Sequence, residues 1–198
     1  MVRWPAAEPA SELAHERPPL SVGLHVDLAE WAFREDRWRP VYERVPVADA
    51  WAVAKEVDAQ LDLFRALVGR DPSHLDSHQH AHRSDVVHSV LRERAAGLGV
   101  PLREEAPGIR YCGAFYAQLE TGEPYPEGIT SERLLETLAG LTEGLTELGC
   151  HPALHVDFDS AYAVERLEEV RTLCDPRVKA CVRELGLELT SFRGLPSR

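Results

Sequence analysis

One short segment of the sequence concentrates the side chains that bind metals. Residues 73–85 read SHLDSHQHAHRSD and hold four histidines and two aspartates. Neutral imidazole is the commonest protein ligand for borderline divalent metals, and a nearby carboxylate either binds the metal or orients an imidazole. The segment therefore predicts a metal site, with a polar turn of surface histidines as the simpler alternative.

Residue spacing within this segment predicts which side chains share a face. In an extended strand, residues i and i+2 point to the same side. An extended conformation would therefore place five side chains together: His74, Asp76, His78, His80 and His82. A catalytic metal site keeps one position open for water, so we expect only about two of these to be ligands.

The apolar pattern along the chain alternates between helical and extended periods. Helices are predicted over 47–68, 85–98 and 161–173, after Thr130, and from Asp175-Pro176 to Gly186. Strands are predicted over 99–104, 145–151 and 187–192. Gly69 is expected to cap the first of these helices, and Ser84 or Asp85 to open the second. Such alternation predicts an α/β fold with a mainly parallel sheet, either open or closed into a barrel.

Polar side chains recur where predicted strands end. His25 follows the apolar stretch LSVGL, the histidine-rich segment follows Pro72, and His151 follows TELGC. Ligands of parallel α/β folds gather at the carboxyl ends of the strands. The coincidence of three such clusters carries more weight than any one of them, since a lone histidine at a strand end is commonly structural.

Composition limits the class of protein. The chain has 198 residues, 44% of them hydrophobic, which suits one domain spanning 1–198. Its net charge of −11, without a Lys/Arg cluster, argues against a nucleic-acid partner. Four dispersed cysteines without a CxxC pair are typical of reduced thiols in a cytosol. No apolar run suits a signal peptide or a membrane span, so we expect a cytoplasmic protein.

Several motifs together resemble one family. LSVGLHVDL, SHLDSHQHAH, AFYAQ, TELGCHPA and the stretch from SAYAVERLEE to LTSF occur in the order typical of YdjC-like (ChbG-type) carbohydrate deacetylases. The resemblance covers residues 1 to about 195. It implies a distorted (β/α) barrel and the metal-dependent removal of acetyl groups from N-acetylated sugars, such as chitooligosaccharides. Zinc or magnesium would be the metal.

The resemblance also implies roles for individual residues. His25 of GLH and His78 of DSH match the two histidine metal ligands, while Asp76 and His80 are candidates for supporting them. His151 of HPA matches a histidine near the substrate, and an acid is needed there to protonate the departing amine. Ala153 replaces the glycine that is commoner in the family after the HP pair. The substrate-binding candidates are Arg103, Tyr162, Arg166 and Glu169.

One family motif is missing from the sequence. Members usually begin with a strand that ends in an ADDFG-like motif, whose aspartates supply a third metal ligand and a general base. This sequence contains no Asp-Asp pair, and its first 25 residues resemble the family's second strand and helix. Three explanations are open: a misassigned start codon, a true truncation that is inactive, or replacement of the missing ligand by Asp27 or Asp76.

Two other functions remain as alternatives. The chain can be a degenerate family member that binds sugar or metal without turnover. HQHAHRSD can instead open a PHP-type phosphoesterase, although that motif normally begins a chain and continues with glycine. Sugar specificity is expected in loops 30–46 and 106–128, where Trp31, Trp38, Phe115 and Tyr116 are candidates for stacking on a sugar ring. The sequence leaves homo-oligomerisation open.

Overall fold

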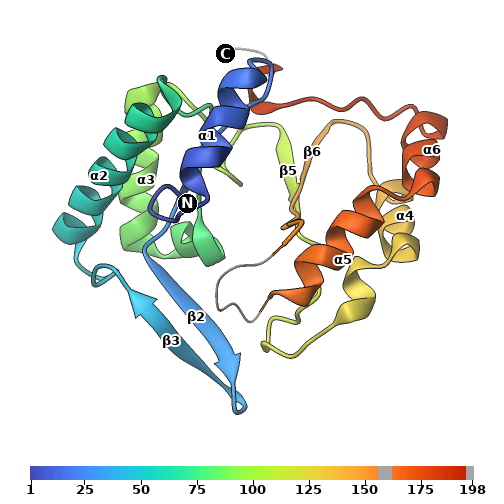
Figure 1. The fold of residues 1–198 in the computed structure, drawn as a ribbon, viewed down its shortest axis with the longest axis horizontal. Coiled ribbons are helices and arrows are strands. Elements are labelled where there is room, and N and C mark those ends of the chain that lie inside the picture. The colour runs from blue at the N-terminus through green and yellow to red at the C-terminus, as the bar shows by residue number, and fades with distance from the viewer. Residues whose placement is uncertain (156–161, 195–198) are drawn as a thin grey trace. The chain divides into compact units, whose positions relative to one another are not determined.

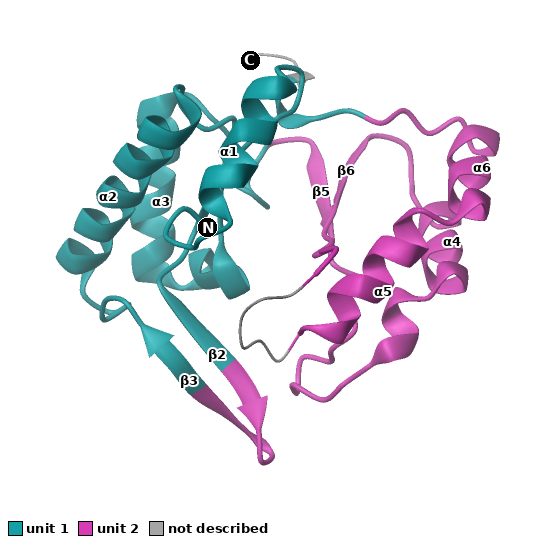
Figure 2. Cartoon of the chain, viewed as in Figure 1, with its two compact units in different colours: residues 1–31, 40–106, 190–198 teal, residues 32–39, 107–189 magenta. Residues whose placement is uncertain are grey.

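The computed structural model describes residues 1–155 and 162–194. The chain divides into two compact units (Figure 2). Unit 1 comprises residues 1–31, 40–106 and 190–198, and unit 2 comprises residues 32–39 and 107–189. Among the described residues, no helix has the length and apolar character needed to cross a bilayer.

Unit 1 is built on a parallel strand pair covered by helices (Figure 1). Strand β1 (Leu24–Val26) pairs with β4 (Leu75–Ser77), and Leu75 also bridges in parallel to Leu102. The helices are α1 (Ala7–Glu16), α2 (Ala50–Val68) and α3 (Asp85–Leu98), with the 3-10 segment η1 (His78–Arg83) between β4 and α3. Apolar side chains of α2, α3, β1 and β4 form one buried core.

Local sequence signals fix the ends of the two long helices. The Asp49 carboxylate accepts hydrogen bonds from the backbone N–H groups of Trp51 and Ala52, which satisfies two donors at the start of α2. Gly69 ends α2 with φ of 71°, a left-handed conformation that favours glycine. Ser84 precedes α3, as predicted. Both helices therefore confirm the prediction, with α2 starting three residues later than expected.

A hairpin occupies most of the segment that the sequence predicted to be a variable loop, residues 30–46. Strands β2 (Ala29–Arg34) and β3 (Arg37–Glu43) pair across a two-residue turn. Both turn residues, Glu35 and Asp36, have positive φ, the geometry that matches the twist of hairpin strands. The turn lacks the usual Asn-Gly or Asp-Gly signature, which explains why the sequence pattern did not reveal it.

Unit 2 repeats the pairing of parallel strands with helices. Strands β5 (Ile109–Cys112) and β6 (Leu145–Leu148) are parallel, with helix α4 (Ser131–Ala139) between them in the chain. Helices α5 (Val164–Leu173) and α6 (Pro176–Glu184) follow β6. The 3-10 segment η2 (Pro126–Ile129) precedes α4. The side chains of Thr130 and Asp175 cap α4 and α6, as the sequence predicts. Residue 161, where the sequence starts the helix ending at 173, lies outside the described residues.

All three predicted strands differ in the structure. Residues 99–104 form no strand, and only Leu102 bridges in parallel to Leu75. Residues 187–191 form no strand. Leu189 is 85% exposed, so its apolar side chain is not covered by a core, and the segment pairs with no strand that the structure describes. The chain ends there in the short 3-10 segment η3 (Phe192–Gly194). The strand predicted over 145–151 forms only over Leu145–Leu148, and its residues are half-buried. The parallel pairs nevertheless confirm an α/β fold.

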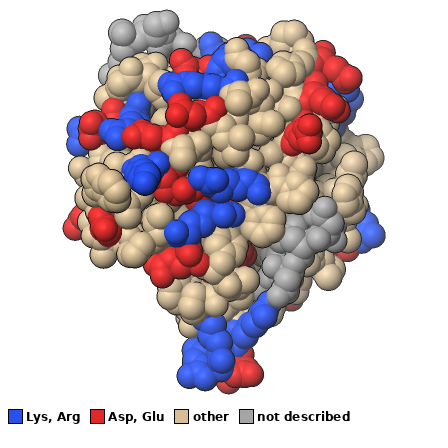
Figure 3. All heavy atoms as spheres, turned by 60° about the vertical axis from the view of Figure 1, so that its left-hand side comes forward, with Lys and Arg blue, Asp and Glu red and all other residues tan. Residues whose placement is uncertain are grey.

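The surface carries both signs of charge. In the face shown in Figure 3, acidic and basic side chains are interspersed. Ion pairs join such side chains within unit 1. Arg94 of α3 pairs with Asp58 of α2, and Arg3 pairs with Glu56 of α2. The face therefore lacks the continuous basic surface that a nucleic-acid backbone requires.

Candidate active site

The parallel pairing of β1 and β4 brings His25 and His78 together. His25 lies in the middle of β1 opposite Asp76, and His78 follows the last residue of β4. Nε2 of His25 is 3.4 Å from Nδ1 of His78, and the rings meet edge to face at 74°. Two nitrogens bound tetrahedrally to one zinc ion at about 2.0–2.1 Å lie about 3.3 Å apart. The spacing of these two nitrogens therefore fits one shared cation.

A buried carboxylate holds the outer nitrogen of each ring. Asp76 Oδ2 is 2.8 Å from His25 Nδ1, and Glu30 Oε2 is 2.6 Å from His78 Nε2. Asp76 and Glu30 are 5% and 7% exposed. A carboxylate that accepts the outer ring proton fixes the tautomer and leaves the inner nitrogen as a lone-pair donor. Both inner nitrogens, which face each other, are thereby available to a metal.

Asp76 is held as an anion by the cations around it. Arg103 NH1 lies 2.6 Å from Asp76 Oδ2, the same oxygen that faces His25. Burial acts to raise the pKa of Asp76, but the charge and hydrogen bond of His25 and the charge of Arg103 outweigh it and lower the pKa to about 2. Arg103, a predicted substrate-binding residue, is thus an ion-pair partner of Asp76.

The histidine-rich segment turns sharply after His78, which corrects the expectation of one extended face. Gln79 and His80 have φ of 48° and 53°, and η1 replaces the predicted strand from His78 onward. The Gln79 side chain explains the turn: its Oε1 accepts from the Trp31 backbone N–H at 2.8 Å, and its Nε2 donates to the Trp31 carbonyl at 2.7 Å. These two hydrogen bonds also hold Glu30, one residue before Trp31 in β2, beside His78.

His74 lies apart from the pair formed by His25 and His78. Its ring stacks on Phe192 with centroids 4.0 Å apart, and its Nδ1 lies 3.0 Å from Ser73 Oγ. Burial lowers the pKa of His74 to about 4. The structure therefore shows a packed, neutral imidazole at this position, and the predicted common face with His78 is wrong for His74.

His80 and His82 gather around a second carboxylate, Glu104. Glu104 Oε1 is 3.0 Å from His80 Nδ1 and 3.6 Å from His82 Nε2. The three potential ligand atoms all lie within 4.8 Å of one another, a grouping able to hold a metal ion. Desolvation, with Arg83 nearby, lowers the pKa of His80 to about 4, and desolvation also lowers the pKa of His82. Both imidazoles are therefore neutral near pH 7.

In unit 2, the predicted residues His151, Tyr162, Arg166 and Glu169 form one cluster. Glu169 is fully buried and accepts hydrogen bonds from the Tyr162 hydroxyl at 2.6 Å and from the His151 backbone N–H. Arg166 donates to the Tyr162 carbonyl at 2.9 Å and to the His151 carbonyl at 3.2 Å. The loop carrying His151 is therefore tied to α5, which leaves the imidazole itself partly exposed, at 36%.

Desolvation raises the pKa values of two groups in this cluster, Glu169 and Tyr162. Burial raises the pKa of the Glu169 carboxyl above its usual value, although the hydrogen bonds from Tyr162 and His151 act to lower it. Burial and the hydrogen bond to Glu169 raise the pKa of Tyr162. Tyr162 also accepts from the Ala117 backbone N–H at 3.0 Å. The Tyr162 hydroxyl is therefore a neutral donor with fixed partners.

The Asp27 carboxylate is saturated by other side chains. It is fully buried, and it accepts from the Tyr42 hydroxyl at 2.7 Å, from Trp4 Nε1 at 3.0 Å and from Arg44 Nε at 2.9 Å. Gln60 bonds both the backbone N–H and the carbonyl of Asp27. These contacts argue against Asp27 as the replacement metal ligand and make it an anchor for the end of β1.

The aromatic residues proposed to stack on sugar differ in exposure. Phe115 is fully buried in the core of unit 2, so the stacking role expected for it is wrong. Tyr116 stacks on Tyr162 at 4.6 Å and lies 5.2 Å from the His151 ring. Trp31 and Trp38 are each 42% exposed on the hairpin strands. Sequence alone does not separate core aromatics from exposed ones in irregular segments.

Three polar residues of these sites were absent from the sequence analysis: Glu30, Gln79 and Glu104. Glu104 offered a signal, since it ends the predicted strand 99–104 and so lies where ligands gather. Glu30 and Gln79 offered none, because their roles depend on the pairing of β2 with η1 across 48 residues of sequence.

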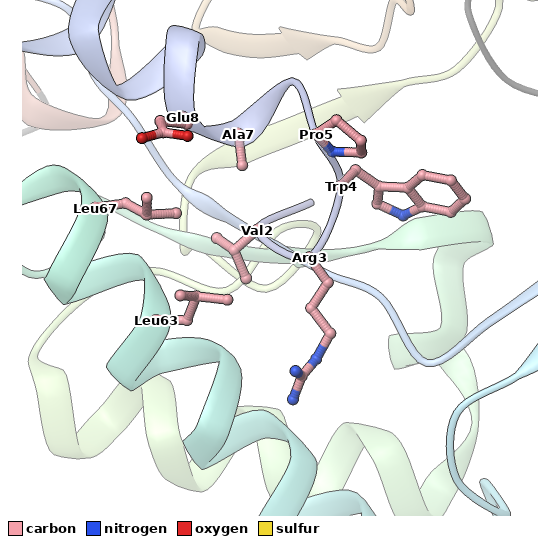
Figure 4. Close-up of a pocket in the computed structure, with 8 residues that line it drawn as sticks. All are labelled: Val2, Arg3, Trp4, Pro5, Ala7, Glu8, Leu63 and Leu67. Carbon is pink, nitrogen blue, oxygen red and sulfur yellow. The ribbon is translucent and has the colours of Figure 1, made fainter.

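One surface pocket lies away from every histidine of these clusters (Figure 4). Leu63 and Leu67 project from α2 toward Val2 of the N-terminal segment. The remaining lining residues are Arg3, Trp4, Pro5, Ala7 and Glu8. The pocket brings together no pair of groups with catalytic geometry, so the candidate active site is the histidine pair.

Comparison with known proteins agrees with these motifs. The model of a family described as YdjC-like protein matches residues 1–184. A carbohydrate deacetylase from Vibrio parahaemolyticus is 31% identical over 100% of this chain and 84% of its own length. A carbohydrate deacetylase from Geobacillus stearothermophilus is 28% identical over 98% of this chain and 83% of its own length. A chitooligosaccharide deacetylase from an Enterobacter species is 28% identical over 98% of this chain and 86% of its own length.

A solved structure shares the fold. A protein from Enterococcus faecalis, described in terms of cellobiose-phosphate cleavage, superposes with a TM-score of 0.74 at 24% identity, covering 98% of this chain and 85% of that one. At this level of identity the likeness speaks for the α/β fold alone.

Proposed function

Because this chain belongs to the YdjC-like family, we propose that it removes acetyl groups from N-acetylated sugars by metal-dependent hydrolysis. Relatives named carbohydrate and chitooligosaccharide deacetylases, at 28–31% identity, support the sugar substrate and the reaction. The observation that carries the proposal is the 3.4 Å approach of His25 Nε2 to His78 Nδ1. Zinc or magnesium is the proposed metal, and the proposed location is the cytoplasm.

The chain's own residues account for part of the work of amide hydrolysis. We assign His25 and His78 to hold the cation, with Asp76 and Glu30 orienting their rings. A divalent ion at this position supplies polarisation of the amide carbonyl and a lowered pKa for water. His151 is the proposed acid that gives a proton to the departing amine, consistent with its partly exposed ring.

The remaining predicted residues are proposed to bind the substrate. Arg103, Tyr162, Arg166 and Glu169 stay proposals as substrate-binding groups; the hydrogen bonds of Tyr162, Arg166 and Glu169 position the loop at His151. His80 is treated below as part of a separate cluster. A single domain folded as a distorted (β/α) barrel is likewise proposed from the resemblance.

Acetate release from N,N′-diacetylchitobiose tests the proposal. The chain is freed of metal with a chelator, and acetate is measured after adding zinc or magnesium. We expect release only with added metal, and loss of release when His151 is replaced by alanine. A chain that binds metal but releases no acetate from this substrate or from longer N-acetylated oligosaccharides contradicts the enzyme assignment and favours a sugar-binding or metal-binding role.

Replacing Glu30 by glutamine is expected to weaken metal binding about 10–100-fold, as loss of a carboxylate behind a metal-binding histidine typically does. Glutamine keeps the size of the side chain but lacks the charge that holds the outer proton of His78. Metal affinity is measured by titration calorimetry with zinc. Glu35→Gln, on the exposed hairpin turn, is the matched control, and equal affinities for the two variants contradict the orienting role of Glu30.

A further inference from the structure

His80, His82 and Glu104 are not needed for the cation proposed to bind at His25 and His78. The two pairs of histidines contact different carboxylates. Glu104 contacts His80 and His82, whereas Asp76 and Glu30 contact His25 and His78. We propose that His80, His82 and Glu104 form a second divalent-cation site, distinct from the one proposed for deacetylation. The inference goes beyond the proposed function.

His82 provides the first independent observation. It is 3% exposed, and among the described residues no group forms a hydrogen bond with its Nε2. The other ring nitrogen, Nδ1, lies 2.7 Å from Ser77 Oγ, which also accepts the His82 backbone N–H at 2.9 Å. When Nδ1 carries the proton and donates it to Ser77, Nε2 keeps its lone pair and faces Glu104.

An unsatisfied buried nitrogen has a cost that a cation would remove. Leaving such a group without a partner destabilises the folded chain. Glu104 Oε1, at 3.6 Å, is too distant for a good hydrogen bond to His82 Nε2. An ion between the two atoms at about 2.0–2.1 Å from each would satisfy both, because ligand atoms of one zinc lie about 3.3 Å apart in tetrahedral geometry. The 3.0 Å and 3.6 Å separations bracket that value.

Backbone conformation provides a second observation. His80 and Glu104 have φ of 53° and 68°, left-handed conformations that non-glycine residues seldom adopt. Such conformations are strained and cluster at sites where side chains must be aimed. Here the two strained residues are the two ligands that meet at one point, with Nδ1 of His80 3.0 Å from Oε1 of Glu104.

Arg83 forms a two-pronged ion pair with the Glu104 carboxylate in this structure. Its Nε and NH2 donate to the two oxygens of Glu104 at 3.1 Å and 2.9 Å. The Arg83 side chain is 57% exposed, so it can move into water without leaving a buried charge unpaired. A cation can therefore replace the guanidinium at Oε1. Two imidazoles and one carboxylate, with a position left open, form a ligand set that suits zinc among divalent metals.

Zinc stoichiometry tests the second site. The chelator-treated chain is dialysed against zinc at rising concentration, and bound metal is counted by mass spectrometry. We expect about two ions per chain for the wild type and about one for Glu104→Gln, since a neutral amide is a poor zinc ligand. Glu105→Gln is the matched control, because the neighbouring carboxylate pairs with His88 and should leave about two ions bound.

Two further variants separate this site from the proposed catalytic one. His80→Asn replaces an imidazole ligand, whose side chain is 32% exposed, by a neutral amide, which is a poor zinc ligand. It is expected to lower binding to about one ion, even if Glu104→Gln fails to fold. His25→Asn/His78→Asn should also retain about one ion. If Glu104→Gln and His80→Asn bind zinc like the wild type, or the double variant binds none, the second site is refuted. The double variant can bind as many zinc ions as the wild type while Glu104→Gln and His80→Asn bind fewer. In that case the deacetylase site fails and the second site stands.

Discussion

His78→Asn is expected to lower acetate release from N,N′-diacetylchitobiose by about 1,000-fold or more, because bound metal contributes several kcal/mol to amide hydrolysis and each 1.4 kcal/mol is tenfold in rate. His78 Nδ1 faces His25 Nε2 at 3.4 Å, and Glu30 holds the other ring nitrogen. Asparagine can place an amide oxygen near the position of Nδ1, but a neutral amide is a poor zinc ligand. It also lacks the outer nitrogen that Glu30 holds. Initial rates are measured with saturating metal and with the protein's fold verified by circular dichroism.

His88→Asn is the matched control for this prediction. His88 lies on α3 and pairs with Glu105, and its side chain is 36% exposed. The same substitution there removes an imidazole without touching His25 or His78, so the rate should stay within about twofold of the wild type. Equal losses of activity in the two variants, or an unchanged rate in His78→Asn, would show that His78 has no special role.

Asp27→Ala is expected to reduce the free energy of unfolding by about 3–5 kcal/mol, the usual effect of breaking a buried ion pair. The Asp27 side chain is fully buried, and its loss leaves the donors of Trp4, Tyr42 and Arg44 without their acceptor. For a chain of this size, the midpoint of thermal unfolding should fall by roughly 6–20 °C. Urea unfolding monitored by tryptophan fluorescence measures the free energy.

Asp58→Ala tests whether burial is the cause. Asp58 forms an equally close pair with Arg94, with separations of 2.6 Å and 3.0 Å, but its side chain is 51% exposed. An exposed pair of this kind contributes about 0–1 kcal/mol. The account of Asp27 as a buried anchor is wrong if the two variants lose similar amounts of stability.

Helix positions were readable from sequence because caps and apolar spacing are local signals. Asp49 and Gly69 mark the ends of α2, and Thr130 and Asp175 mark the starts of α4 and α6. Strands depend on partners far away in the sequence. The stretch 187–192 has the right residue types but pairs with nothing that the structure describes, whereas the hairpin of β2 and β3 lacked a recognisable turn.

The candidate site was predictable only where local sequence signals marked its residues. His25 and His78 were selected by resemblance and by their places beside predicted strands, and the register of β1 against β4 explains why their rings meet. The turn at Gln79 was not readable, because left-handed residues are usually glycine and this one is stabilised by Trp31. Consequently the division of the histidines into two clusters, one with Glu30 and one with Glu104, required the structure.

The most direct test of the account is a crystal structure of the chain with zinc, using anomalous scattering to locate the metal. We predict a peak about 2.0–2.1 Å from both His25 Nε2 and His78 Nδ1, with Asp76 and Glu30 on the outer nitrogens. A map in which no metal touches both rings, or in which either ring turns away from the other, would contradict the proposed metal site and the deacetylase mechanism built on it.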